Sequence, residues 1–202
     1  MGFKTTLAAA LFVALVSAIG NAQEFSAEVV YLEPNGSASP SHPTSKIYVS
    51  KDKFRLETNG FTGAVLLVDR EGQAAYVLLP AKKTYQALAA GPSEYFHAEN
   101  PDDACASWQG AAEQKIVCQK VDTEMVNGRD TVKYENKGAS PSAATAVWVD
   151  KALKFVVKWQ AADSSAELRN IKDEKLAAAL FTLPSDYKLA TPQKGSKGFS
   201  KR

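Results

Sequence analysis

Polar and apolar residues alternate along most of the chain between Phe25 and Trp159, which is the period of a β-strand with one buried face. Turn-forming residues, such as those in Asn127-Gly128, interrupt the alternation at intervals of about ten residues. The pattern predicts about ten antiparallel strands joined by hairpins. The expected strands are residues 25–32, 46–50, 53–58, 64–69, 74–79, 84–88, 121–126, 130–135, 144–150, 153–160 and 164–171.

The strands differ in how apolar their two faces are. In residues 53–58, Phe54 and Leu56 alternate with charged residues, which predicts one dry face and one wet face. Residues 65–68 and 76–79 are apolar on both faces, so we expect both sides of these strands to be covered.

Two segments are candidates for this cover, residues 92–110 and residues 173–180. In the second, Asp173 can cap a short helix that continues to Leu180. Antiparallel strands with one dry face can stack as a sandwich or curl into a barrel. Because the helical material is short and lies in two places, the sequence favours a curled sheet. The predicted fold is mainly β (α+β), an incomplete barrel with one or two short helices over its open concave side.

The N-terminus has the three-part pattern of a signal peptide, with Lys4, an apolar run over residues 7–19, and the small residues Gly20 and Ala22. The apolar run is shorter than the roughly twenty residues of a membrane span, and no later stretch approaches that length. We therefore expect a periplasmic or secreted protein after cleavage near Ala22, with no integral membrane segment. Gln23 follows the cleavage site, where a lipoprotein would have cysteine.

The chain is predicted to divide into a signal peptide (1–22), a single domain (23–190) and a basic disordered tail (191–202). The formal net charge is +2, but the tail alone holds four cations, so the body of the protein is mildly acidic. A nucleic-acid-binding protein usually has a basic face, so no nucleic-acid partner is expected. The tail either keeps the protein soluble or is attracted weakly to anionic lipid headgroups.

The two cysteines, Cys105 and Cys118, are predicted to form a disulfide, because an exported chain folds in an oxidising compartment. A catalytic thiol is the alternative, with His97 as a possible base. Detection of a free thiol would favour that alternative.

Motifs that carry catalysis or hold cofactors are missing from the sequence. The chain has only His42 and His97 as histidines, and it has no Cys-x-x-Cys, no G-x-S-x-G and no glycine-rich phosphate loop. The acidic pair Asp102-Asp103 is typical of a helix N-terminus more than of a catalytic dyad. We therefore expect no metal, no cofactor and no enzymatic activity.

Aromatic residues on the predicted strands are the one positive functional signal. They form either an ordinary core or the lining of a cavity for an acyl chain, and the sequence leaves both open. The residues expected to line the apolar interior are Phe54, Leu56, Val132, Tyr134, Phe155, Val157, Trp159 and Leu168.

The order of several segments resembles the outer-membrane lipoprotein-sorting superfamily, the periplasmic lipoprotein carriers, and most of all its branch of bacterial secreted proteins of unknown function. Residues 46–57, 65–72 and 75–86 match its early strands, residues 147–154 match its late hairpin, and residues 180–188 match its closing Phe-x-x-Pro-x-x-Tyr. The resemblance implies an unclosed, strongly curved barrel with helices across its mouth, which binds acyl chains of lipids or lipoproteins.

Together these features predict a non-catalytic periplasmic protein that binds a lipid or the acyl chain of a lipidated partner. The alternative is an envelope module with a solidly packed core that binds another protein or has a structural role.

Overall fold

The computed structural model describes residues 24–59, 63–88, 96–111, 117–137, 145–162 and 164–190. The predicted signal peptide and basic tail lie outside the described residues. The described strands are β1 (Phe25–Leu32), β2 (Ser45–Val49), β3 (Lys53–Glu57), β4 (Val65–Asp69), β5 (Ala74–Leu79), β6 (Thr84–Leu88), β7 (Val117–Val126), β8 (Arg129–Lys137), β9 (Ala146–Asp150), β10 (Phe155–Gln160), β11 (Ser165–Asp173) and β12 (Lys188–Leu189). The helical elements among the same residues are α1 (Ala104–Ala111) and the 3-10 turns η1 (Pro80–Lys82), η3 (Pro101–Asp103) and η4 (Ala178–Phe181).

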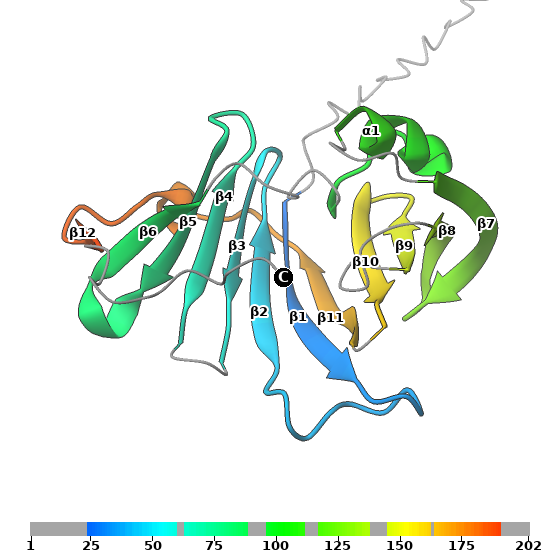
Figure 1. The fold of residues 1–202 in the computed structure, drawn as a ribbon, viewed down its shortest axis with the longest axis horizontal. Coiled ribbons are helices and arrows are strands. Elements are labelled where there is room, and N and C mark those ends of the chain that lie inside the picture. The colour runs from blue at the N-terminus through cyan, green and yellow to red at the C-terminus, as the bar shows by residue number, and fades with distance from the viewer. Residues whose placement is uncertain are drawn as a thin grey trace, which may run out of the picture.

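All twelve described strands form one sheet in the order β12-β6-β5-β4-β3-β2-β1-β11-β10-β9-β8-β7 (Figure 1). Neighbouring strands are antiparallel except β12 and β6, which are parallel. β1 pairs with both β2 and β11, so the first strand joins the two halves of the sheet. β12 and β7 lie at opposite ends of the strand order, so the sheet is open and the predicted incomplete barrel is confirmed.

Hairpin turns carry the residue types that their backbones require. Asn127 and Gly128 connect β7 to β8 with φ of 50° and 79°, the left-handed conformation that a tight two-residue turn requires. The turn before β10 is closed by a side chain instead. The buried Asp150 accepts hydrogen bonds from the backbone N–H groups of Ala152 and Leu153, both at 2.8 Å.

The largest apolar cluster, here called the inner cluster, joins strands from both halves of the sheet. Partly buried side chains, including Leu56, Phe96 and Trp159, pack against it. Its buried members are Phe25, Ala27, Val29, Ile47, Val49, Phe54, Val68, Ala75, Val126, Ala146, Trp148, Leu153, Phe155, Val157, Ala166 and Leu168.

The sheet is strongly curved around this cluster. The ring of Phe96 lies 5.9 Å from that of Phe54 on β3 and 6.0 Å from that of Phe155 on β10. Three strands separate β3 from β10, so in a flat sheet their axes would lie about 19 Å apart. One aromatic ring contacts both strands because the sheet bends around it.

β4 and β5 are covered on their second face as well, which confirms the expectation from their two apolar faces. Val65, Leu67 and Leu78 are buried there with Phe181, in what is here called the outer cluster. The segment that follows Asp173 supplies this cover, as predicted.

The predicted helix over residues 173–180 is wrong. β11 continues to Asp173, which pairs with Phe25, and the segment beyond it is irregular until the 3-10 turn η4. An isolated helix of this length is marginal in water. The strand ladder takes Asp173, and of the described residues that follow it in this segment only those of η4 form helical hydrogen bonds.

The face of β3 that was expected to be wet is partly covered by the same segment. The Arg55 side chain is only 17% exposed, and it donates hydrogen bonds to Glu57 at 2.7 Å and to the carbonyl oxygen of Leu180 at 3.2 Å. The charged side chains of β3 therefore help to hold the C-terminal segment against the sheet.

The other predicted cover, the region around residues 92–110, contains α1, but α1 packs on β8, β9 and β10 and not on β4 and β5 (Figure 1). The partly buried Cys105 and Cys118 contact this second cluster, here called the helix cluster. Its buried members are Ala98, Ala104, Trp108, Val132, Tyr134, Val147, Val149 and Val156.

The regular alternation predicted for residues 153–160 is broken in the structure. The register with β9 shifts between Val156 and Lys158, as in a β-bulge. Val156 belongs to the helix cluster while the next residue, Val157, belongs to the inner cluster. Successive strand residues face opposite sides of the sheet, so both valines are buried because both faces of β10 are covered here.

Candidate functional site

Phe96 is partly buried and packs against the inner cluster. Its ring contacts those of Phe54, Phe155 and Trp159 at centroid distances of 5.9, 6.0 and 5.9 Å. Aromatic pairs at these distances contribute about 0.5–1.5 kcal/mol each beyond the burial of their surface. Phe96 itself lies on neither a described strand nor α1, so it enters the cluster from a connecting segment.

The described backbone contacts of this segment lie at His97 and Ala98. His97 forms an isolated β-bridge with Phe155, and the backbone N–H of Ala98 donates to the carbonyl oxygen of Lys154 at 2.9 Å. The Trp108 indole N–H donates to the carbonyl oxygen of His97 at 3.1 Å. These contacts fix His97 and Ala98 next to β10 and α1.

Tyr134 on β8 holds the start of α1 through two hydrogen bonds of its hydroxyl group. The Tyr134 hydroxyl donates to the carbonyl oxygen of Pro101 at 2.7 Å and accepts from the backbone N–H of Ala104 at 3.2 Å. Tyr134 is fully buried, and burial raises the pKa of its hydroxyl. The Asn100 side chain accepts from the backbone N–H of Asp102 at 3.1 Å, which caps the 3-10 turn that leads into the helix.

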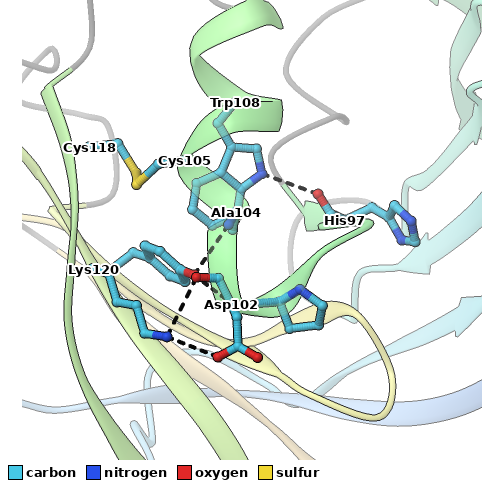
Figure 2. Close-up of a disulfide and its surroundings, with 9 residues drawn as sticks. His97, Asp102, Ala104, Cys105, Trp108, Cys118 and Lys120 are labelled. Carbon is cyan, nitrogen blue, oxygen red and sulfur yellow. Dashed lines mark hydrogen bonds and ion pairs between the residues drawn. A yellow bond between two sulfur atoms is a disulfide. The ribbon is translucent and has the colours of Figure 1, made fainter.

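A disulfide joins α1 to β7 through Cys105 and Cys118 (Figure 2). The predicted disulfide is confirmed, and the alternative of a free catalytic thiol is wrong. Beside it, the exposed Lys120 and Asp102 form an ion pair at 2.9 Å. The acidic pair that follows Pro101 therefore occupies the helix N-terminus, as expected.

The space within the inner cluster is small. A cavity of about 10 Å³ lies between Phe54, Phe155, Arg70 and His97. This is room for no more than one water molecule. This space next to Phe54 and Phe155 is therefore too small for an acyl chain.

A larger cavity of about 150 Å³ adjoins it, and the described residues that line it are Arg70, His97, Glu99 and Ser107. Arg70 and His97 border both cavities. The Nε atom of Arg70 is buried and has no hydrogen-bond partner among the described residues. Burial lowers the pKa of His97, and the nearby positive charge of Arg70 lowers it further.

The structure divides the eight predicted lining residues between two clusters. The inner cluster takes six of them, with Leu56 and Trp159 packed at its border. These six are Phe54, Leu56, Phe155, Val157, Trp159 and Leu168. Val132 and Tyr134 lie in the helix cluster, where they support α1.

Sequence reasoning missed the two residues that define the site, Phe96 and Arg70. Phe96 lies outside every predicted strand, so the alternation gave no reason to select it. Arg70 stands in the turn between β4 and β5, where charged residues are common. Its distinguishing property, a buried atom without a partner, depends on segments that are distant in the sequence.

Neither a metal centre nor a membrane helix appears in the described part of the chain. No three His, Cys, Asp or Glu side chains there are grouped so that they could hold a metal ion. No described helix is long and apolar enough to cross a membrane.

No protein-family model matches the sequence, and neither does any curated protein sequence. Solved structures do match. PNGF-II is similar at a TM-score of 0.53 and 15% identity, over 84% of this chain and 31% of that one. The chain thus spans about a third of the length of PNGF-II. At this identity the likeness shows a shared fold alone.

Two other similar structures have lower TM-scores. The Pseudomonas aeruginosa MucA/MucB complex matches at 0.47 and 17% identity, over 84% of this chain and 58% of that one. A putative outer membrane lipoprotein-sorting protein domain from Vibrio parahaemolyticus matches at 0.33 and 15% identity, over 79% of this chain and 89% of that one. The second of these structures bears the name of the superfamily that the sequence resembles.

Proposed function

We propose that this protein is a non-catalytic binding protein of the cell envelope, which takes the acyl chain of a lipid or of a lipidated protein into its inner cluster. The observation that carries the proposal is the position of Phe96. A single, partly buried side chain from a connecting segment contacts both Phe54 on β3 and Phe155 on β10, within an apolar cluster that spans a curved, open sheet. When Phe96 moves out, an acyl chain can take its place against Phe54, Phe155 and Trp159.

The contacts of Phe96 suit a plug that can be displaced. Its ring contacts are apolar and non-directional, so the methylene groups of an acyl chain can replace them. A chain that buries methylene groups gains about 0.8 kcal/mol for each. Several methylenes are therefore enough to offset the loss of the three aromatic contacts.

The disulfide supports a location outside the cytoplasm. Disulfides such as Cys105–Cys118 persist in oxidising compartments, which include the bacterial periplasm and the extracellular space. Together with the expected signal peptide, this favours a periplasmic or secreted protein that meets lipids and lipoproteins between membranes.

The test is the binding of a fluorescent fatty acid to the purified protein and to two variants. Phe96→Ala should bind the probe about tenfold more tightly than the wild type, because the acyl chain no longer has to displace the ring. Phe181→Ala removes a comparable ring from the outer cluster and should leave the affinity unchanged.

A second measurement uses the protein as its host makes it. Extraction with organic solvent and mass spectrometry should recover an acyl lipid in stoichiometric amount. If no lipid is recovered, and neither the wild type nor Phe96→Ala binds the probe, the acyl-binding function is excluded.

The open edge of the sheet favours a second candidate, an envelope module that binds another protein. β7 pairs with β8 on one side and has no partner strand on the other among the described residues. Three large apolar side chains on β7 are exposed, Val117, Val121 and Met125. Exposed edge strands of this kind are templates for pairing with another chain.

The two candidates respond to different substitutions. A partner that pairs with β7 should lose affinity for the double variant Val121→Lys/Met125→Lys, because charge on an edge strand opposes pairing. The same partner should still bind Phe96→Ala. If the wild type has no partner in cross-linked envelope extracts, or if the lysine variant retains that partner, this candidate fails.

A further inference from the structure

Arg70 is held by its backbone at the rim of the inner cluster. Its N–H donates to the carbonyl oxygen of Asp52 at 2.8 Å, and its own carbonyl oxygen accepts from the N–H of Gln73 at 3.2 Å. The same turn is tightened by the N–H of Gly72, which donates to the Asp69 side chain at 2.9 Å. A β-carbon at Gly72 would lie 3.2 Å from that carboxyl group, so the turn fits glycine closely.

The guanidinium of Arg70 has no carboxylate partner in the described ranges. None of the ion pairs there includes it, while the neighbouring carboxylates of Asp52 and Asp69 lie against Lys51 and Lys53 at 3.8 and 2.8 Å. A buried donor without an acceptor is unfavourable, so a ligand that supplies the acceptor gains affinity. Arginine at such a position, beside a cavity, is the side chain best suited to bind a carboxylate or a phosphate through two parallel hydrogen bonds.

The cavity beside Arg70 provides the space for such a group. Its volume of about 150 Å³ has room for several water molecules, and hence for a carboxylate or phosphate group. His97 and Ser107 supply two more polar side chains to its lining. Ser107 lies on α1, and the disulfide at Cys105 fixes that helix to β7.

The cavity shares two of its lining residues with the small space beside the inner cluster. Arg70 and His97 also border the small space next to Phe54 and Phe155. Phe96 and His97 are adjacent in the sequence, and the first contributes to the inner cluster while the second lines the cavity. Two consecutive residues therefore connect the polar cavity to the apolar cluster.

We propose that Arg70 and His97 form an oxyanion site, for a carboxylate or a phosphate group, at the mouth of the inner cluster. The group belongs either to the headgroup of an amphiphile, whose acyl chain replaces Phe96, or to a free anion. The amphiphile as its source rests on the function proposed above, whereas the oxyanion site itself does not.

The charges around the site define where the anion binds. His97 is influenced by Arg70 and Lys154, which lower its pKa, and by Glu99 and Asp52, which raise it. Glu99 is exposed and lines the cavity, so it repels an anion. The anion therefore binds on the Arg70 side of the cavity, and removal of the Glu99 charge should strengthen binding.

The test compares dodecanoate with dodecanol as competitors of the fluorescent fatty acid. The wild type should prefer dodecanoate by at least about tenfold, which is the lower range for a hydrogen-bonded charge. Arg70→Met should remove the preference, and Glu99→Gln should increase it. Lys82→Met, which removes an exposed cation from the turn after β5, should leave it unchanged.

A measurement on the wild type keeps the test independent of variant folding. The chain has only two histidines, so the pKa of His97 can be followed by NMR, with His97→Gln to assign its signal. Dodecanoate or inorganic phosphate should raise the pKa of His97, because a bound anion stabilises the charged imidazole. Dodecanol should not raise it.

The outcomes separate the two proposals. Equal competition by dodecanoate and dodecanol overturns the headgroup site and leaves acyl binding intact. If neither amphiphile competes but phosphate raises the pKa of His97, the acyl function fails and the site takes free anions. If neither dodecanoate nor phosphate changes that pKa, the oxyanion site is overturned.

Discussion

The sheet is covered in two places, and the two covers are built in opposite ways. On β8, β9 and β10 the cover is α1, which is fixed by a disulfide and by the hydroxyl of the buried Tyr134. On β4 and β5 the cover is the irregular C-terminal segment, which is held by the apolar side chains of Leu180 and Phe181 and by Arg55.

The difference follows from how each segment satisfies its backbone. A short helix leaves unpaired N–H groups at its start, and here a capping asparagine and a buried tyrosine take part of that role. Most residues of the C-terminal segment are exposed, so water can bind their backbone groups and fewer protein partners are needed. The α1 cover should therefore depend on a few specific links, and the C-terminal cover on the sum of apolar contacts.

Tyr134→Ala should have the largest effect on stability among the tests of this contrast. The substitution removes a fully buried ring and both hydroxyl hydrogen bonds, so it should lower the free energy of unfolding by about 4 kcal/mol. Tyr134→Phe keeps the ring and should lower it by about 1–2 kcal/mol. Urea unfolding followed by fluorescence measures both, and equal losses for the two variants would show that the hydroxyl alone anchors the helix.

Removal of the disulfide is the next test. Cys105→Ser/Cys118→Ser should lower the free energy of unfolding by about 3 kcal/mol, because the closed loop of 13 residues restrains the unfolded chain. Hydrogen exchange should increase in α1 and stay unchanged in η4. An equal increase of hydrogen exchange in α1 and in η4 would contradict the view that the two covers are held separately.

Leu180→Ala tests the C-terminal cover. The side chain is partly buried in the outer cluster, so its loss should lower the free energy of unfolding by about 2 kcal/mol. Leu189→Ala, at a residue that is 61% exposed, is the matched control and should have almost no effect. Limited proteolysis should cut the Leu180 variant beyond β11 first, and the cover would be misassigned if cleavage began near α1.

The smallest effect concerns His97, which lies beside the α1 cover. Because burial lowers the pKa of His97, the unfolded chain binds that proton more readily than the folded protein. This contribution to stability is fully present above the ordinary histidine pKa of about 6.5. It is lost as the pH falls from about 6.5 toward the lower pKa that His97 has in the folded protein. His97→Gln should therefore lose less stability than the wild type between pH 7.5 and pH 5.5, as unfolding measured at both pH values will show. The same loss in both proteins would exclude this contribution.

The strands were predictable because each depends mainly on neighbours in the sequence. The predicted bounds of 25–32, 74–79 and 84–88 agree with β1, β5 and β6. β7 begins at Val117, four residues earlier than predicted, because it pairs along nearly all of β8. Its first residues do not alternate, so only the partner strand extends it.

The amino-acid sequence by itself determined the open antiparallel sheet, the hairpin at Asn127-Gly128 and the disulfide, since alternation, turn chemistry and cysteine pairing are local or nearly so. Only the tertiary structure decided which cover packs on which strands, that Tyr134 anchors a helix, and that Arg70 and His97 line the same cavity. Those features depend on contacts between segments far apart in the chain. Their physical basis is the curvature of the sheet, which brings β3 and β10 to the same aromatic ring.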